Sequence, residues 1–112
     1  EGFITIVDRK KDVINAGGIV VSSCEVEEAL FTHPAVLEVA VIPVPDPKRI
    51  EAIGAVVVLE EGAIATMQEL RSHVRGSLAE FKAPRHVWFV DALPKNSAGK
   101  VQKVELRKRF VG

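Results

Sequence analysis

The chain has 112 residues, of which 47% are hydrophobic and 27% are charged. These values are typical of one soluble globular domain, and they exclude a disordered or fibrous chain. Fifteen basic side chains balance fifteen acidic ones, so no overall field would attract nucleic acid or an anionic membrane. No apolar run approaches the roughly 20 residues that a membrane-spanning helix needs.

The first residues and the single cysteine indicate context. The chain begins with Glu1-Gly2-Phe3 instead of methionine, in what resembles the approach to a strand. Cys24 has no second cysteine to pair with, which favours a reducing compartment. We therefore expect a cytoplasmic domain that belongs to a longer protein.

Near the start, β-branched residues predict a short strand over 3–7 and then a hairpin. Val13-Ile14 and Ile19-Val20-Val21 flank Gly17-Gly18, which permits the positive φ angles of a tight turn. Ser22 stands three residues before Glu25, the spacing of a capping box, so a helix should follow and run to about Thr32.

The middle of the chain predicts two strands and a second helix. Residues 36–44 and 53–59 are rich in valine and alanine, and we expect a rigid loop at Pro43, Pro45 and Pro47 between them. Thr66 and Glu69 repeat the capping-box spacing, and the helix that they begin should continue until about residue 81.

The last third predicts a core strand over 86–90, a loop over 93–100 and a short basic helix over 104–110. The element order favours an α+β fold, a small β-sheet with helices packed against it plus an N-terminal β-hairpin. We expect residues 1–112 to form this one domain.

The loop Ser97-Ala98-Gly99-Lys100 is the stretch most suggestive of chemistry, because a glycine beside a lysine lets the ammonium be aimed at a phosphate or carboxylate. It is not a Walker motif, since Pro94 and Val101 stand where glycine and a hydroxyl residue are required. Six basic residues against one acid between 95 and 109 predict a local positive patch.

Other chemistries find no support in the residue pattern. The three histidines lie far apart, and Cys24 has no histidine at the spacing of a metal site, so no metal is assigned. The glycine and aromatic run of an RNA-recognition strand is absent.

Four separated stretches, in this order and spacing, resemble the C-terminal domain of the adenylate-forming superfamily. They are Asp8-Arg9-Lys10-Lys11-Asp12; Gly17-Gly18 with Glu25-Val26-Glu27; Phe81-Lys82-Ala83-Pro84-Arg85; and Leu93-Pro94-Lys95 with Gly99-Lys100. The ending Gly99-Lys100-Val101-Gln102-Lys103 is more similar to acyl-CoA synthetases than to peptide-synthetase adenylation domains.

The resemblance implies a ligase that converts a carboxylic acid and ATP to an acyl-adenylate, and then transfers the acyl group to coenzyme A (CoA). It implies ATP with Mg²⁺, bound mainly by an N-terminal domain absent from this chain, and CoA as co-substrate. The isolated domain is expected to be inactive, and fatty, aryl and small dicarboxylic acids all remain open as substrates.

By resemblance, Lys100 is the catalytic lysine of adenylation and Arg9 contacts the ribose of ATP or AMP. Lys11 occupies the hinge position about which the domain rotates between the two half-reactions. Gly17 and Gly18 would then line a tunnel for the pantetheine arm of CoA.

Phe81 and Arg85 match positions that contact the adenine and phosphates of CoA. Departures are Asp8 where many members have glycine, Ser23 for a frequent proline, and Ala83 for a basic residue of one aryl-CoA ligase type. Two alternatives remain: an adenylation domain that loads a carrier protein, and a non-catalytic α+β interaction module.

Overall fold

The computed structural model describes residues 13–48, 50–79 and 82–111. The strand predicted over 3–7 lies outside these ranges. Among the described residues the strands are β1 (Val13–Ala16), β2 (Ile19–Ser22), β3 (Val36–Pro45), β4 (Glu51–Leu59) and β5 (His86–Phe89). The helices are α2 (Ser23–Phe31), α3 (Met67–Arg75) and α4 (Lys103–Phe110).

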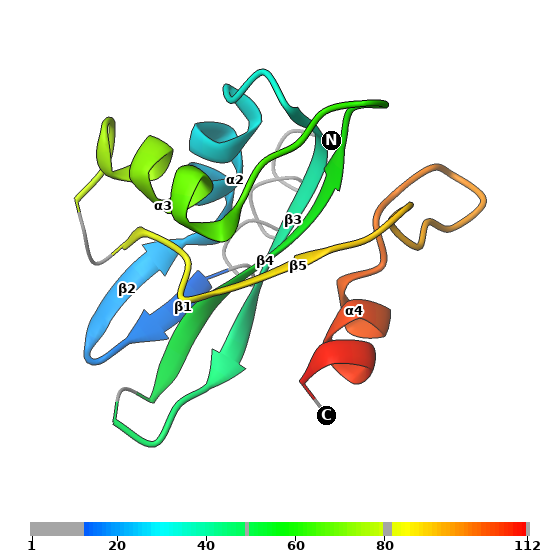
Figure 1. Ribbon diagram of the computed structural model, residues 1–112. Helices are drawn as coiled ribbons and strands as arrows, with labels where there is room; N and C mark the ends of the chain where they lie inside the picture. Colours follow the sequence, from blue (N-terminus) through cyan, green and yellow to red (C-terminus); the bar gives the residue numbers. More distant parts are fainter. Residues whose placement is uncertain (1–12, 49, 80–81, 112) are drawn as a thin grey trace, which may run out of the picture.

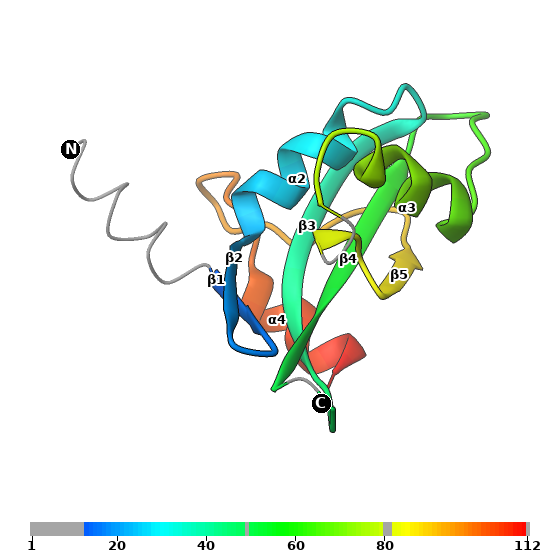
Figure 2. The same ribbon diagram turned by 90° about the vertical axis from the view of Figure 1, so that its left-hand side faces the viewer.

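The strands form two sheets. β1 and β2 make the predicted hairpin, in which Ala16 pairs with Ile19 across the two glycines. In the other sheet β4 is central, antiparallel to β3 and parallel to β5. Figures 1 and 2 show α2 and α3 on one face of this three-stranded sheet and α4 on the other. The expected α+β fold is confirmed.

Each face of the sheet has its own apolar cluster. The cluster under the hairpin, α2 and α3 includes buried Leu30, Leu70 and Val74. The cluster under α4 includes buried Ile42, Val56, Leu93 and Leu106. Residues 52–58 of the central strand are therefore buried on both sides, which is why β4 is apolar without alternation.

Gly54 in β4 has a packing role. A Cβ atom at this position would lie 2.7 Å from Val44 Cγ2 and 3.0 Å from Trp88 Cζ3. Both distances are shorter than van der Waals contact, so the small residue lets the Trp88 ring lie close to the central strand.

The proline-rich segment differs from its prediction. Pro43 and Pro45 lie inside β3, paired with Ile53 and Glu51, and are not part of a loop. β3 lies at the edge of its sheet, and a proline at an edge can direct its missing N–H away from the partner strand. Only the turn that follows, with Pro47, is irregular.

The start of α2 also differs from its prediction. Ser22 is the N-cap residue, but its side chain makes no capping hydrogen bond. The carboxylate of Glu25 instead pairs with Lys82 Nζ at 2.9 Å. Lys82, which is distant in sequence, therefore pairs with the Glu25 carboxylate that was predicted to complete the capping box.

The second capping box is confirmed, but the end of its helix was predicted too late. Thr66 N donates to Glu69 Oε1 (2.8 Å) and Glu69 N donates to Thr66 Oγ1 (3.1 Å). α3 ends at Arg75, and the N–H of Gly76 caps it on the carbonyl of Ser72 at 3.1 Å. Glycine is a poor helix former, which favours termination at this point.

Candidate functional site

Lys100 lies on a short, ordered loop whose geometry depends on Asn96. The Asn96 side-chain oxygen accepts the N–H of Ala98 at 2.9 Å and that of Lys100 at 3.0 Å. The Asn96 backbone N–H donates to the Lys100 carbonyl at 3.0 Å, and its carbonyl accepts the N–H of Gly99 at 2.9 Å. Gly99 has a φ of 82°, which closes the turn.

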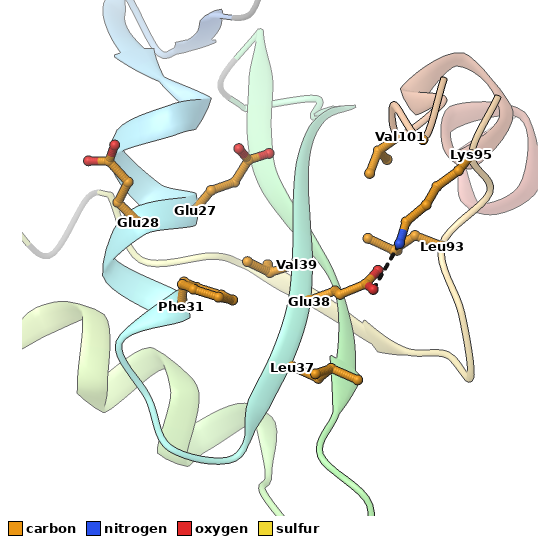
Figure 3. A pocket seen from close by; sticks show the side chains of 10 residues that line it. Glu27, Glu28, Phe31, Leu37, Glu38, Val39, Leu93, Lys95 and Val101 are labelled. Carbon is orange, nitrogen blue, oxygen red and sulfur yellow. Dashed lines mark hydrogen bonds and ion pairs between the residues drawn. The ribbon is translucent and has the colours of Figure 1, made fainter. Parts of the chain in front are cut away.

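The base of this loop is fixed to the sheet. Lys95 pairs with Val101 in an antiparallel bridge, and Lys95 Nζ lies 2.8 Å from Glu38 Oε2 of β3. Figure 3 shows this ion pair beside a groove of about 470 Å³ between α2, β3 and the loop. Lys100 directly precedes Val101 of this bridge, and it is exposed.

We predict that Asn96→Ala loosens the loop without unfolding the domain. The Ala98 and Lys100 amides would lose their acceptor, and a net hydrogen bond contributes about 1 kcal/mol. Amide hydrogen exchange at Ala98 and Lys100 should become faster, while the exchange of β4 amides stays slow. Ser97→Ala is the matched control, because Ser97 is an exposed neighbour in the same loop. Unchanged exchange in Asn96→Ala would refute this role.

Gly17 and Gly18 form the two-residue turn of the β1–β2 hairpin, with φ angles of 71° and 97°. Positive φ at both positions is the requirement of a type I′ turn. Gly18 N donates to Asn15 Oδ1 at 2.8 Å, and Asn15 N donates to Glu51 Oε1 of β4 at 2.8 Å. The turn is thus presented at the surface by a hairpin that is anchored to the sheet.

Arg85 lies immediately before β5 and its side chain is exposed. Its backbone N–H donates to the carbonyl of Ile53 at 2.8 Å, which fixes the main chain from which the guanidinium extends. The other predicted site residues, Arg9, Lys11 and Phe81, lie outside the described residues. Figure 1 places the Gly17–Gly18 turn and the Lys100 loop on opposite sides of the domain.

Comparison with known proteins places the chain in a family. Residues 25–100 match the model of the AMP-binding enzyme C-terminal domain. The chain belongs to this family.

Named relatives of this AMP-binding enzyme C-terminal domain include acyl-CoA synthetases and CoA ligases. It is 46% identical over 111 residues to the long-chain-fatty-acid–CoA ligase of Bacillus subtilis, covering 99% of this chain and 19% of the relative. It is 43% identical over 117 residues to human mitochondrial acyl-coenzyme A synthetase ACSM1, covering 100% of this chain and 20% of that relative. The chain therefore spans about a fifth of the length of these relatives.

A solved structure gives the same result. Apo MatB from Rhodopseudomonas palustris superimposes with a TM-score of 0.87 at 42% identity, over 91% of this chain and 20% of that one. The resemblance inferred from the four sequence stretches is confirmed, and the fold is that of the C-terminal portion of adenylate-forming enzymes.

The family-like stretch Glu25-Val26-Glu27 has a structural role in this AMP-binding enzyme C-terminal domain. Val26 is fully buried, and its neighbours Glu25 and Glu27 both form ion pairs. Glu27 Oε2 lies 2.7 Å from Lys103 Nζ and accepts the N–H of Val41 at 2.8 Å. The Glu25-Val26-Glu27 stretch therefore links α2 to β3, to α4 and to the segment before β5.

The positive patch predicted over 95–109 is smaller than its sequence suggests. Lys95 pairs with Glu38 and Lys103 with Glu27, both acids that lie far away in sequence. The cations that remain on the outer surface of α4 are Arg107, Lys108 and Arg109, all exposed. Lys95 and Lys103 therefore contribute little to the positive charge of this surface.

The described part of the chain contains no group of three histidine, cysteine or acidic side chains arranged to hold a metal. Within the same residues no helix is long and apolar enough to cross a membrane.

The sequence analysis did not identify Asn96 as the residue that organises the Lys100 loop. The available signal was an Asn four residues before Lys100 with a glycine between them, a combination typical of an Asx turn.

Proposed function

We propose that this chain is the mobile C-terminal domain of an ATP-dependent acid–CoA ligase. The observation that carries the proposal is Lys100 on a hydrogen-bonded loop. It is supported by relatives named as an acyl-CoA synthetase and a CoA ligase, which match this chain along nearly its whole length. In this proposal the acid-binding and ATP-binding pockets belong to the remainder of the longer protein.

In the first half-reaction, a carboxylate oxygen of the acid attacks the α-phosphorus of ATP. The new P–O bond gives the acyl-adenylate, and the bond from the α-phosphorus to the bridging oxygen breaks to release pyrophosphate. Lys100 would place its ammonium between the attacking carboxylate and the α-phosphate, where negative charge develops. Arg9 would contact the ribose. The Asn96-centred hydrogen bonds support this role, because a positioned charge needs little reorganisation.

In the second half-reaction, the thiol of CoA loses its proton and attacks the acyl carbon, and AMP leaves as the C–O bond breaks. The domain would rotate about Lys11 so that the hairpin replaces Lys100 at the reaction centre. The Gly17–Gly18 turn would line the pantetheine tunnel, and Phe81 and Arg85 would contact the CoA nucleotide. The separation of the two surfaces on the domain supports two working orientations.

The exposed side of the hairpin also supports this assignment. Ile19 and Val20 are 50% and 65% exposed directly after the two glycines. Apolar side chains at a turn with open backbone suit a surface that is covered in one orientation only.

Mg²⁺ would enter with ATP and be held mainly outside this domain. A cytoplasmic location remains a prediction.

The direct test uses the full-length protein with ATP, CoA and a panel of fatty, aryl and dicarboxylic acids. We expect pyrophosphate and AMP to be released and an acyl-CoA thioester to form with at least one class of acid. Acid-dependent pyrophosphate exchange with acyl transfer only to a carrier protein would contradict the CoA assignment. No acid-dependent exchange with any acid would contradict adenylation.

The tunnel assignment predicts that Gly18→Leu in the full-length protein raises the KM for CoA. A Cβ at Gly18 meets no atom of the described residues within 4 Å, so the added side chain would point into the space assigned to pantetheine. Leucine is also strained at this positive φ, which should lower the free energy of unfolding of the domain by about 1–2 kcal/mol.

Gly62→Leu is the matched control, because Gly62 has a φ of 78° and an equally open surrounding at a different turn. It should lose similar stability but keep the KM for CoA. Equal KM values in both variants would mean that Gly18 serves the hairpin only.

A further inference from the structure

The end of the Lys100 loop, where α4 begins, is held by Glu27 of α2. Lys103 is the first residue of α4, and its Nζ atom lies 2.7 Å from Glu27 Oε2 and 3.4 Å from the Oγ atom of buried Ser23. The same Glu27 oxygen accepts the backbone N–H of Val41 in β3 at 2.8 Å. One carboxylate therefore joins three elements, α2, β3 and α4.

A short chain of contacts leads from this ion pair to Lys100. Gln102 directly precedes Lys103 and is the N-cap residue of α4, so a fixed start of α4 also fixes Gln102. The backbone N–H of Gln102 donates to the carbonyl of Pro94 at 2.8 Å, which closes the neck of the loop. Its side-chain Nε2 donates to the carbonyl of Lys100 at 3.2 Å. The backbone that carries Lys100 is thus tied to the start of α4.

The pair of Lys103 with Glu27 is more shielded from water than the pair at the other end of the loop. Its side chains are 25% and 21% exposed, whereas those of Lys95 and Glu38 are 40% and 35% exposed. Solvent screens an ion pair less when the pair is partly buried, and a charged hydrogen bond of this length is stronger than a neutral one. The anchor at α4 should therefore hold the loop more firmly than the anchor at Lys95.

We infer that Glu27 is a positioning residue for Lys100, and that it acts through Lys103 and Gln102. The inference rests on the proposed function, in which the Lys100 ammonium lies between the attacking carboxylate and the α-phosphate. A misplacement of about 1 Å can cost about a hundredfold in rate, so the link from α2 to the loop matters for adenylation. Glu27 itself touches no reactant in this assignment.

The kinetic test measures both half-reactions of the full-length protein. Glu27→Gln removes the charge and keeps an oxygen that can accept the N–H of Val41. It should lower kcat for acid-dependent pyrophosphate exchange about tenfold, and it should leave both the KM for ATP and thioester formation from supplied acyl-adenylate unchanged. Lys103→Met should have the same effect. Lys103→Arg, which keeps the charge, should restore most of the rate.

Glu28→Gln is the matched control. Glu28 is the next residue of α2 and is exposed, and Figure 3 shows its carboxylate pointing away from the sheet, whereas that of Glu27 points toward it. Both half-reactions should be unchanged in this variant. The double variant of Glu27→Gln with Lys100→Ala should be no slower in exchange than Lys100→Ala alone, because a residue that acts through Lys100 has no further effect once the ammonium is gone.

Four kinetic outcomes would overturn the inference: no slowing in Glu27→Gln, equal slowing of both half-reactions, equal effects of Glu27→Gln and Glu28→Gln, or a further loss in the double variant. If Lys100→Ala itself does not slow pyrophosphate exchange, the proposed function is wrong instead. Amide hydrogen exchange of the full-length variants then still tests the link. In Glu27→Gln the amides of Lys100 and Gln102 should exchange faster while those of β4 stay slow, and unchanged exchange would refute the positioning of the loop by Glu27.

Discussion

Lys100→Ala in the full-length protein is expected to slow acyl-adenylate formation about 100- to 1,000-fold and to leave thioester formation from supplied acyl-adenylate nearly unchanged. Loss of one preorganised charge from a site of developing negative charge costs about 3–4 kcal/mol, which corresponds to this range of rates. The asymmetry follows because the lysine would serve only one of the two domain orientations. Pyrophosphate exchange measures the first half-reaction, and thiol-dependent AMP release from acyl-adenylate measures the second.

Neighbouring cations are not expected to rescue the variant. Lys95 and Lys103 are the nearest lysines in sequence, and both form ion pairs, at 2.8 Å with Glu38 and at 2.7 Å with Glu27. Lys108→Ala is the matched control, since it removes one exposed positive charge from α4 and should change neither half-reaction. Equal damage to both half-reactions by Lys100→Ala, or damage to neither, would refute the assignment of Lys100. Acetylation of Lys100 would remove the same charge and should have the same asymmetric effect.

Leu106→Ala is expected to cause the largest loss of stability among single changes on α4. Leu106 is fully buried in the cluster between α4 and the sheet. Truncation of a buried leucine typically costs about 2–5 kcal/mol, a large part of the roughly 5–15 kcal/mol that stabilises a domain. Urea unfolding of the chain, monitored by circular dichroism, should show the transition at a clearly lower midpoint.

Val104→Ala is the control on the same helix, because Val104 is 61% exposed. Its expected effect is within about 0.5 kcal/mol. Similar midpoints for the two variants would mean that Leu106 packing does not hold α4 on the sheet. Two further contacts hold α4 on the sheet. The rings of Trp88 and Phe110 stack with their centroids 4.9 Å apart, and Lys103 forms an ion pair with Glu27. Leu106→Ala should therefore loosen α4 before it disrupts β4.

Two interactions between near neighbours in sequence were predicted correctly. The Gly17–Gly18 turn follows from two adjacent residues without side chains, and the capping box of Thr66 and Glu69 closes over three residues. The loop that carries Lys100 was likewise evident from its composition. In each case the residues that make the contact lie within one turn of the chain, so their spacing could indicate the geometry before the fold was known.

The predictions that failed depended on distant partners. Ser22 and Glu25 have the spacing of a capping box, yet Lys82, 57 residues away, pairs with Glu25 instead. Pro43 and Pro45 would disrupt a central strand, but their place in an edge strand follows only from which strands pair.

By itself, the sequence determined the family, the α+β class, the hairpin turn and the loop that presents Lys100, because short-range spacing and residue type specify each of these. The tertiary structure decided which charges are paired and which converge. Lys82 and Lys103 meet Glu25 and Glu27 only because the segment before β5 and the helix α4 pack beside α2. No local pattern specifies such a meeting, since burial, and with it the cost of an unpaired donor, is set by residues from the whole fold.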